Sequence, residues 1–427
     1  MKRVAIIGAG AAGLCAARHA AAASGEVKDI VVFEQTAQLG GTWVYTDDTC
    51  VDANGLPLHS SMYRDMKTNL PKEVMGFPGF PFPENERSFI HHSQVLRYLQ
   101  DYASHYGLEQ YIRFETVVDS VTPTAEGENA ASLWKICSRS LKLGTEHTDL
   151  FDAVIVCNGH FFEPIIPDVE GSESFTGRIL HSHNYRSNES FANERVVCLG
   201  AGPSGIDISL EIAAVAAQVY LCHEHAPFES PLLANLTQKR GLKRVAGSTV
   251  QLLNDESLED ISTIVLCTGY HYRFPFLKGV RLMTENNRVT PLFQHLVHVD
   301  HPRSLFFVGL PFTVLPFTCF DIQLRYAFAL ITNKVDPLDR QRMLDWEQRD
   351  FIHRTTVLGL RPKFAHFLGP AQWQYMVDLA ALGRFTNPVT SAVSGLFDAV
   401  HCARSRDLPG YKELRYQLLD NEHFRQL

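Results

Sequence analysis

The chain has 427 residues, of which 45% are hydrophobic and 20% are charged, and its formal net charge is −8. At about 150 residues per domain, this length predicts two or three domains with large cores, and the ordinary composition excludes disordered, collagen-like and disulfide-scaffold proteins. The negative charge offers no basic face for nucleic acid. The nearest candidate for a membrane-spanning helix, residues 305–320, is broken by Pro311 and Pro316, so we expect no membrane anchor.

The cysteine pattern and the N-terminus bear on where the protein works. Nine scattered cysteines include no C-x-x-C pair, which predicts buried reduced thiols, no metal site and no redox dithiol of the kind a dithiol flavoprotein reductase needs. We therefore expect a soluble, cytoplasmic protein. The apolar run 4–12 resembles a leader peptide only faintly, because it carries a glycine-rich motif. Asn-x-Ser/Thr sites at Asn188 and Asn235 leave a secreted form open.

The N-terminus predicts a strand, a glycine-rich turn and a helix. An apolar strand over residues 4–7 enters Gly8-Ala9-Gly10-Ala11-Ala12-Gly13, an Ala-rich helix follows to about residue 23, and a second strand over 29–33 ends in Glu34. In a dinucleotide-binding unit Gly8 makes the tight turn, Gly10 lets a pyrophosphate approach the backbone, and Gly13 permits close helix–strand packing. The phosphates would rest on the helix N-terminus, and Glu34 would accept a ribose hydroxyl.

The same pattern is repeated almost two hundred residues later. A strand over 195–199 enters Gly200-Ala201-Gly202-Pro203-Ser204-Gly205, an amphipathic helix follows to about residue 217, and a strand covers 218–222. Apolar runs of the buried parallel-strand type, each ending in a glycine turn, close both units. The sequence thus predicts an α/β fold with two Rossmann-like domains: an FAD-binding domain over 1–160 and 271–427, and an inserted NADP-binding domain over 161–270.

The remaining segments predict mostly helices. Residues 93–106 carry an apolar stripe and stop at Gly107, and a Pro-rich loop spans 71–83. The last ninety residues predict helices over 339–353 and 371–382 and otherwise a polar tail.

The two units differ in what they predict about the cofactor. Glu34 suits the unphosphorylated ribose of FAD or NAD. In the second unit the strand ends in His223, Glu224 and His225, where a reader of a 2′-phosphate usually has arginine. Both histidines add positive charge only when protonated, and Glu224 opposes it. To bind a 2′-phosphate, the side chain of Arg186, Lys239 or Arg240 would have to lie beside this strand end. We expect NADPH as the second cofactor, with NADH as the rival.

Around the second unit, residues 175–185 fit the pattern F-x-G-x-x-x-H-x-x-x-Y, from Phe175 to Tyr185. With this signature the chain resembles the flavin-containing monooxygenases, which oxygenate soft nitrogen and sulfur atoms. Further similar pieces are Gly40-Gly41-Thr42-Trp43, the stretch 62–73, Cys267-Thr268-Gly269-Tyr270, and Phe307-Val308-Gly309-Leu310 followed by Gln323. The resemblance covers roughly residues 1–330. The short second unit and the unanchored tail look more like the soluble insect branch, which includes pyrrolizidine-alkaloid N-oxygenases.

The resemblance implies roles for individual residues. Asn69 should be the catalytic residue, lying over the flavin ring and hydrogen-bonding near its oxygen-reactive carbon. The other residues expected to bind cofactor are Gly8, Gly10, Gly13, Glu34, Gln35, Gly40, Gly41, Thr42, Trp43, Thr68, Asn69, Tyr185, Gly200, Gly202, Pro203, Ser204, Gly205 and Gln323. His181 should brace the two connections between the units.

The implied activity is oxygenation of a tertiary amine, an alkaloid or a sulfide by NADPH and O₂ through a C4a-hydroperoxyflavin. The cofactor supplies the difficult chemistry, so the chain needs few acid–base groups. The Baeyer–Villiger relatives have Trp-Pro where this chain has Tyr185-Arg186, which argues against ketone oxidation. That reaction and a simple NAD(P)H oxidase stay as alternatives, and a flavoprotein reductase is a weaker one. The expected partners are a small nucleophilic substrate and O₂, with a homo-oligomer possible.

Overall fold

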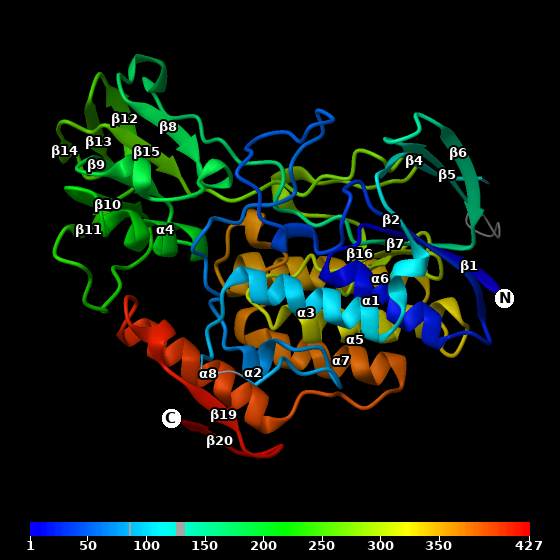
Figure 1. Ribbon diagram of the computed structural model, residues 1–427. Helices are drawn as coiled ribbons and strands as arrows, with labels where there is room; N and C mark the ends of the chain where they lie inside the picture. The colour runs from blue at the N-terminus through cyan, green and yellow to red at the C-terminus, as the bar shows by residue number, and fades with distance from the viewer. Residues whose placement is uncertain (85–86, 125–132) are drawn as a thin grey trace.

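The computed structural model describes residues 1–84, 87–124 and 133–427. Its two largest sheets, one of seven strands that is mostly parallel and one of five parallel strands, lie in separate lobes joined by two connections (Figure 1). This arrangement confirms the α/β fold class that the sequence predicts.

The larger sheet contains the first glycine-rich turn. Its strand order is β16-β17-β18-β7-β1-β2-β3, parallel from β18 to β3 and antiparallel from β16 to β18. The strands are β1 (Lys2–Ile7), β2 (Val27–Phe33), β3 (Ile112–Arg113), β7 (Ala153–Val156), β16 (Leu292–Phe293), β17 (Val297–His298) and β18 (Leu305–Phe307). The sheet is covered on both faces: Val4 and Ile6 face one core, while Ala5 and Ile7 face another. This double burial explains the continuous apolar run of β1.

Helices cover one face of the larger sheet (Figure 1). They are α1 (Ala11–Ala22), α2 (Lys72–Met75), α3 (His92–His105), α5 (Pro316–Ile331), α6 (Arg340–Ile352), α7 (Gln372–Gly383) and α8 (Ser391–Arg406). Local sequence sets their starts: His91 and Gln94 form a capping box at α3, Pro316 occupies the first turn of α5, and the Thr390 side chain caps α8. Among the helices of the described residues, none is long and apolar enough to cross a membrane.

The smaller sheet contains the second glycine-rich turn, and all its strands are parallel in the order β11-β10-β9-β15-β8. The strands are β8 (Arg178–His181), β9 (Arg195–Leu199), β10 (Gln218–His223), β11 (Leu236–Arg240) and β15 (Thr263–Leu266). Helix α4 (Pro203–Ala213) packs on one face. An antiparallel sheet of β12 (Leu242–Ala246), β13 (Thr249–Leu252) and β14 (Ser257–Leu258) covers the other.

The two connections between the lobes pair with each other. Ile165 N–H donates to Gly269 O at 2.9 Å, and His271 N–H donates to Glu163 O at 2.9 Å. The His181 ring lies against Tyr270 on the second connection, with ring centroids 5.2 Å apart. The domain limits at 160/161 and 270/271 stay predictions.

Three features differ from the sequence expectation. Helix α4 ends at Ala213 rather than near residue 217. A third sheet of β4 (Thr116–Pro123), β5 (Trp134–Ser140) and β6 (Glu146–Phe151) covers the second face of the larger sheet, and the sequence analysis did not predict it. The expected polar tail instead forms α8 and the hairpin β19 (Tyr416–Leu418) and β20 (Phe424–Gln426), anchored by the buried Tyr411 and Tyr416.

The two glycosylation sequences are used inside the fold. The Asn188 amide donates to Glu211 O at 2.8 Å, and the Asn235 amide donates to Ala213 O at 2.8 Å and Ala216 O at 2.9 Å. Both side chains thus satisfy carbonyl groups at and just beyond the end of α4, where the regular helical hydrogen bonds end. A glycan on either nitrogen would disturb these bonds.

Candidate functional site

The first glycine-rich turn has no room for any other residue at its ends. Gly8 has φ +101°, and a Cβ there would lie 2.6 Å from Cys157 O. A Cβ on Gly13 would lie 1.8 Å from Gly8 O. Gly10 caps α1 without a side-chain hydrogen bond, so the first N–H groups of the helix stay available. The turn therefore fits an anion such as a pyrophosphate.

Glu34 lies directly beside this turn and is only 6% exposed. Its Oε2 accepts from Ala9 N–H at 2.8 Å, and its Oε1 accepts from Thr36 N–H at 2.9 Å and from the Thr36 hydroxyl at 2.8 Å. Burial raises the pKa of Glu34, and these hydrogen bonds act against that rise. A carboxylate has about four acceptor positions, so one remains for a ribose hydroxyl.

The segment Gly40–Trp43 lies against the same turn. Gly40 N–H donates to Ala9 O at 3.0 Å, and a Cβ on Gly41 would lie 2.9 Å from the Gly10 Cα. The Thr42 hydroxyl is buried and has no hydrogen-bond partner among the described residues. Such an orphaned group fits a ligand that supplies the missing bond. Trp43 is half-buried against the main core.

Gln35 follows Glu34 and ties the end of β2 to the segment 57–59. Its amide nitrogen lies 3.3 Å from Pro57 O and 3.1 Å from His59 Nδ1. The side chain therefore closes one flank of the turn.

Asn69 is exposed, and its side-chain amide has no hydrogen bond within the described part of the chain. Its backbone is nevertheless fixed from the residue before it. Thr68 is buried; its N–H donates to Ile90 O at 2.8 Å, and its hydroxyl accepts from Ile90 N–H at 3.1 Å. Pro71 and α2 follow at once. Asn69 thus presents a free donor and a free acceptor from a rigid segment.

Gln323 lies beside Gly309, as expected, but both ends of its amide are used by the protein. Its Oε1 accepts from Gly309 N–H at 3.0 Å, and its Nε2 donates to the Tyr375 hydroxyl at 2.7 Å, which in turn donates to Gln294 O at 2.8 Å. Gln323 is fully buried on α5. It fixes the turn after β18, and direct contact with a cofactor stays a prediction.

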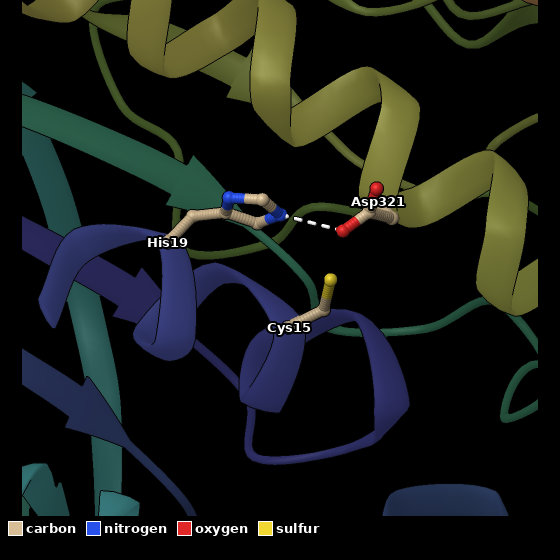
Figure 2. Close-up of side chains that lie close together, drawn as sticks. All are labelled: Cys15, His19 and Asp321. Carbon is tan, nitrogen blue, oxygen red and sulfur yellow. Dashed lines mark hydrogen bonds and ion pairs between the residues drawn. The ribbon is translucent and has the colours of Figure 1, made fainter. Parts of the chain in front are cut away.

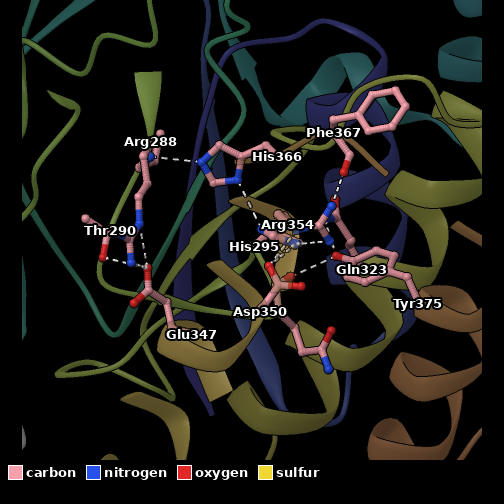
Figure 3. A network of polar contacts seen from close by, with 12 residues as sticks. Arg288, Thr290, His295, Gln323, Glu347, Asp350, Arg354, His366, Phe367 and Tyr375 are labelled. Carbon is pink, nitrogen blue, oxygen red and sulfur yellow. Dashed lines mark hydrogen bonds and ion pairs between the residues drawn. The ribbon is translucent and has the colours of Figure 1, made fainter. Parts of the chain in front are cut away.

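A buried polar network, which no pattern in the sequence predicts, continues behind Gln323 (Figure 3). Val289 N–H donates to His366 Nε2 at 2.9 Å, and the Nδ1 atoms of His366 and His295 lie 3.1 Å apart. His366 must therefore donate from Nδ1 to His295 Nδ1, and His295 Nε2 lies 3.5 Å from the Asp350 carboxylate and 3.4 Å from the Arg354 guanidinium. Burial, together with the charge of Arg354, lowers the pKa of His295 to about 3, so this buried ring is neutral.

The second glycine-rich turn repeats the first. Gly200 has φ +109°, a Cβ there would lie 2.4 Å from Cys267 O, and a Cβ on Gly205 would lie 1.8 Å from Gly200 O. Gly202, Pro203 and Ser204 are exposed at the start of α4, which has no side-chain cap. The second turn also fits a pyrophosphate.

Tyr185 lies in the core of the smaller lobe, in the same hydrophobic cluster as Ile206 of α4. It is 1% exposed, with ring centroids 5.5 Å from Tyr63 and 5.7 Å from Phe191. This position favours a packing role, and contact with a cofactor stays a prediction.

One group of potential metal ligands comes together, although the sequence analysis expected no metal site. Cys15, His19 and Asp321 place a thiol, an imidazole nitrogen and a carboxylate oxygen within 4.8 Å of one another (Figure 2). Asp321 is already paired with His19 at 2.8 Å, Arg325 at 2.6 Å and Arg18 at 3.4 Å. Two guanidinium groups disfavour a further cation, so we interpret the cluster as a clamp between α1 and α5.

Two glycine-rich turns of the dinucleotide-binding type, one in each of two lobes joined by paired connections, define a protein of the two-dinucleotide class. A family model for flavin-binding monooxygenase-like proteins matches residues 1–228. Flavin-containing monooxygenase FMO GS-OX-like 6 of Arabidopsis thaliana is 38% identical over 393 residues, which cover 88% of this chain and 82% of the relative. The chain belongs to the flavin-binding monooxygenase-like family. Flavin-containing monooxygenases of this family use FAD and NADPH, which confirms the expected cofactors.

Solved structures agree with this assignment. S-allyl-L-cysteine S-oxygenase from Allium sativum has a TM-score of 0.87 at 30% identity and covers 96% of this chain and 95% of its own. Tmm from a Pelagibacter strain has a TM-score of 0.85 at 25% identity and covers 99% of this chain and 95% of its own. A cyclohexanone monooxygenase has a TM-score of 0.63 at 13% identity and covers 90% of this chain and 99% of its own. At this identity the likeness shows a shared fold alone. The finer resemblance to the insect branch stays a prediction.

Proposed function

We propose that this chain is an NADPH- and O₂-dependent monooxygenase that oxygenates soft sulfur atoms in small thioethers. The observation that carries this proposal is the likeness to the Allium S-oxygenase over almost the full length of both chains. Tertiary amines and alkaloids, which the sequence analysis expected, are the second substrate class. Sulfide and amine lone pairs attack the same kind of electrophilic oxygen, so the two classes differ in how the substrate is held.

We assign the FAD to the first turn. The pyrophosphate would rest on the N-terminus of α1 at Gly10, and Glu34 would accept a ribose hydroxyl with its remaining acceptor position. Gly41 and the Thr42 hydroxyl would face the flavin side of the turn. The Thr42 hydroxyl has no partner among the described residues and the Glu34 carboxylate keeps an acceptor position, so both groups can take up these hydrogen bonds.

We assign the nicotinamide nucleotide to the second turn, with its pyrophosphate at Gly202, Pro203 and Ser204. When bound, the flavin accepts a hydride from the nicotinamide and activates O₂. The chain contributes position and shelter from water. Asn69 would hold a hydrogen bond at the reacting centre. Gln323 would fix the turn at Gly309 behind it.

The experiment is a coupled balance of NADPH consumed, sulfoxide formed and hydrogen peroxide released by the purified flavin-loaded protein. With S-allyl-L-cysteine as the thioether probe, we expect NADPH consumption to rise and sulfoxide to match it. A tertiary amine probe in parallel compares the second class.

Three results would contradict the proposal, each in favour of a different alternative. Consumption that ignores both probes and yields equivalent hydrogen peroxide indicates an NAD(P)H oxidase. Ester formation from a cyclic ketone, without sulfoxide, indicates a Baeyer–Villiger enzyme. A colourless protein that takes up no added flavin contradicts all flavoprotein functions.

A further inference from the structure

The end of β10 is where the second nucleotide unit must recognise the adenosine ribose. In Rossmann units the residues at the end of the second strand face the ribose 2′ position, and a nearby arginine accommodates a 2′-phosphate. Gly200 N–H donates to Cys222 O as Gly8 N–H donates to Phe33 O, both at 2.8 Å. His223 is therefore the structural counterpart of Glu34, and Glu224 follows it.

The sequence offers Arg186, Lys239 and Arg240 as cations for a 2′-phosphate, but Arg186 and Lys239 already have partners within the protein. Arg186 donates to four backbone carbonyl groups, with distances of 2.7 Å to Thr46 O, 2.7 Å to Asp48 O, 2.7 Å to His183 O and 3.0 Å to Tyr185 O. Lys239 is paired with Glu256. Neither can serve a phosphate without giving up these partners.

Arg240 is the cation of this set that lies at the right place. It is exposed at the end of β11, where its Cα pairs with that of His223. Burial is the largest cause that lowers the pKa of His223, and the charges of His225 and, to a smaller extent, Arg240 act in the same direction. A Cβ on the next residue, Gly241, would lie 3.4 Å from Glu224 Cγ. The backbone that follows Arg240 therefore packs against Glu224, and both residues lie at the same end of the sheet.

A second cation reaches this spot from the far part of the chain. Arg361 lies in the segment between His353–Val357 and Pro362–Phe364, and its guanidinium contacts the Glu224 carboxylate at 2.5 Å. Both side chains are more than half exposed, at 58% and 51%. An ion pair this exposed contributes little to stability, so its guanidinium can exchange a carboxylate for a phosphate at small cost.

His223 adds a fixed acceptor at the base of the spot. The Gln238 amide is oriented by the Phe228 backbone, with Phe228 N–H donating to Oε1 at 2.7 Å and Nε2 donating to Phe228 O at 3.1 Å. His223 Nε2 must therefore donate to that Oε1, at 3.2 Å. Its Nδ1 is then an acceptor, and it is buried with no partner in the described chain. An unpartnered acceptor there fits a ribose hydroxyl, as Glu34 does in the first unit.

We propose that Arg361 and Arg240 together bind the 2′-phosphate of NADPH, with Glu224 holding Arg361 at the rim until the phosphate replaces it. This inference rests on the proposed assignment of the nicotinamide nucleotide to the second turn. It makes the C-terminal segment around residue 361 part of the nucleotide site of the other lobe. A bidentate guanidinium–phosphate contact is among the strong polar contacts.

The test measures equilibrium binding to the flavin-loaded protein by calorimetry, with adenosine 2′,5′-bisphosphate and 5′-AMP as probes. In Arg361→Gln and in Arg240→Gln we expect the bisphosphate to bind about 5–30-fold more weakly, with 5′-AMP changed by less than about twofold. Arg342→Gln removes an exposed arginine that pairs with Asp339, and it is the matched control. Glu224→Gln should keep or tighten bisphosphate binding.

The outcomes separate this inference from the function on which it rests. If wild-type protein discriminates between the two probes and both arginine variants do so equally well, the inference is wrong and the second site stands. If Glu224→Gln loses 5′-AMP and bisphosphate alike, Glu224 reads a ribose hydroxyl and the inference is also wrong. If the wild-type holoprotein binds neither probe while sulfoxide is still formed from NADPH, the placement of the nucleotide itself fails.

Discussion

The two nucleotide-binding units share a turn and differ at the end of the next strand. In both, the first and last glycines of the turn leave no space for a Cβ, and an uncapped helix follows. In the first unit the strand ends in Glu34, which is buried and held by three hydrogen bonds. In the second it ends in His223 and the exposed Glu224, which Arg361 contacts from another lobe. The turn thus binds the pyrophosphate in the same way in both units. The end of the second strand decides whether a free or a phosphorylated ribose is accepted.

The units also differ in how they are supported. The larger sheet has a helical core on one face, which includes α5, α7 and α8, and the Gln323–Tyr375 contact lies inside it. The smaller sheet has one helix and a three-stranded sheet. We expect the first unit to hold its cofactor permanently and the second to exchange it.

The largest expected effects come from adding a methyl group to equivalent glycines. Gly13→Ala places a Cβ 1.8 Å from Gly8 O, so we expect loss of flavin and at least about 3 kcal/mol of stability, beyond ordinary overpacking because a backbone atom is hit. Gly205→Ala makes the same clash in the second unit, and we expect it to keep flavin while nucleotide binding falls about 100-fold. The measurements are the flavin absorbance of purified protein and the dissociation constant of NADP⁺.

Gly202→Ala is the control for this pair, because nothing lies within 4 Å of a Cβ there. It should fold and stay yellow. If Gly205→Ala lost its flavin as readily as Gly13→Ala, the assignment of one cofactor to each turn would be wrong.

Asn69→Ala tests the oxygenation step rather than cofactor binding at either glycine-rich turn. We expect both cofactors to bind and NADPH to reduce the flavin, while sulfoxide per NADPH falls and hydrogen peroxide rises. One lost hydrogen bond of about 1–3 kcal/mol shortens the life of the oxygenating species by about 5–150-fold. Stopped-flow absorbance during reoxidation measures that lifetime. Undiminished product yield would remove Asn69 from the catalytic role.

How far the sequence predicts this molecule depends on the range of the signal. Strands β1, β9 and β10 and helix α3 were predicted to within about two residues, because a glycine turn or a clear apolar period marks them. The β4–β5–β6 sheet was not predicted, because its strands are largely polar and only a few apolar residues, such as Trp134 and Ile136, mark its buried face. Helix α8 has a mixed composition and is stabilised by contacts with distant residues.

The site shows the same limit. The glycines, Glu34 and the pairing of Gln323 with Gly309 follow from local motifs, and the structure brings these residues together as expected. The buried histidines His295 and His366 and the arrival of Arg361 at Glu224 do not, because they join residues 71 and 137 positions apart. No local pattern encodes such a contact.

Tyr375→Phe tests whether the helical support of the first unit matters for its cofactor. Loss of the hydroxyl leaves the Gln323 amide and the Gln294 carbonyl without partners in a buried site, at a cost of about 1–3 kcal/mol. We expect a melting temperature lower by a few degrees and a flavin absorption spectrum shifted by the looser turn at Gly309. Trp373→Phe, at a half-buried position on the same helix, provides the control. An unchanged spectrum together with a lower melting temperature would restrict Tyr375 to a structural role.

The smallest expected effect is a difference in pH dependence between the lobes. Burial raises the pKa of Glu211, on α4, to about 7. The folded state then binds a proton that the unfolded state releases at lower pH, so the contribution of Glu211 to stability falls as pH rises from about 4.5 to about 7. Asp321 in the first unit behaves oppositely: burial raises its pKa, but His19 and Arg325 outweigh burial and lower it, so its contribution is lost only in acid.

At pH 8 we therefore expect the free energy of unfolding of Glu211→Gln to exceed that of wild type by about 1–2 kcal/mol, a value already reduced because Glu211 is only half-buried. At pH 5 we expect no difference. Urea unfolding at the two pH values measures this, with the exposed Glu229→Gln as control. A gain that is equal at both pH values would show that packing, not ionisation, limits the smaller lobe.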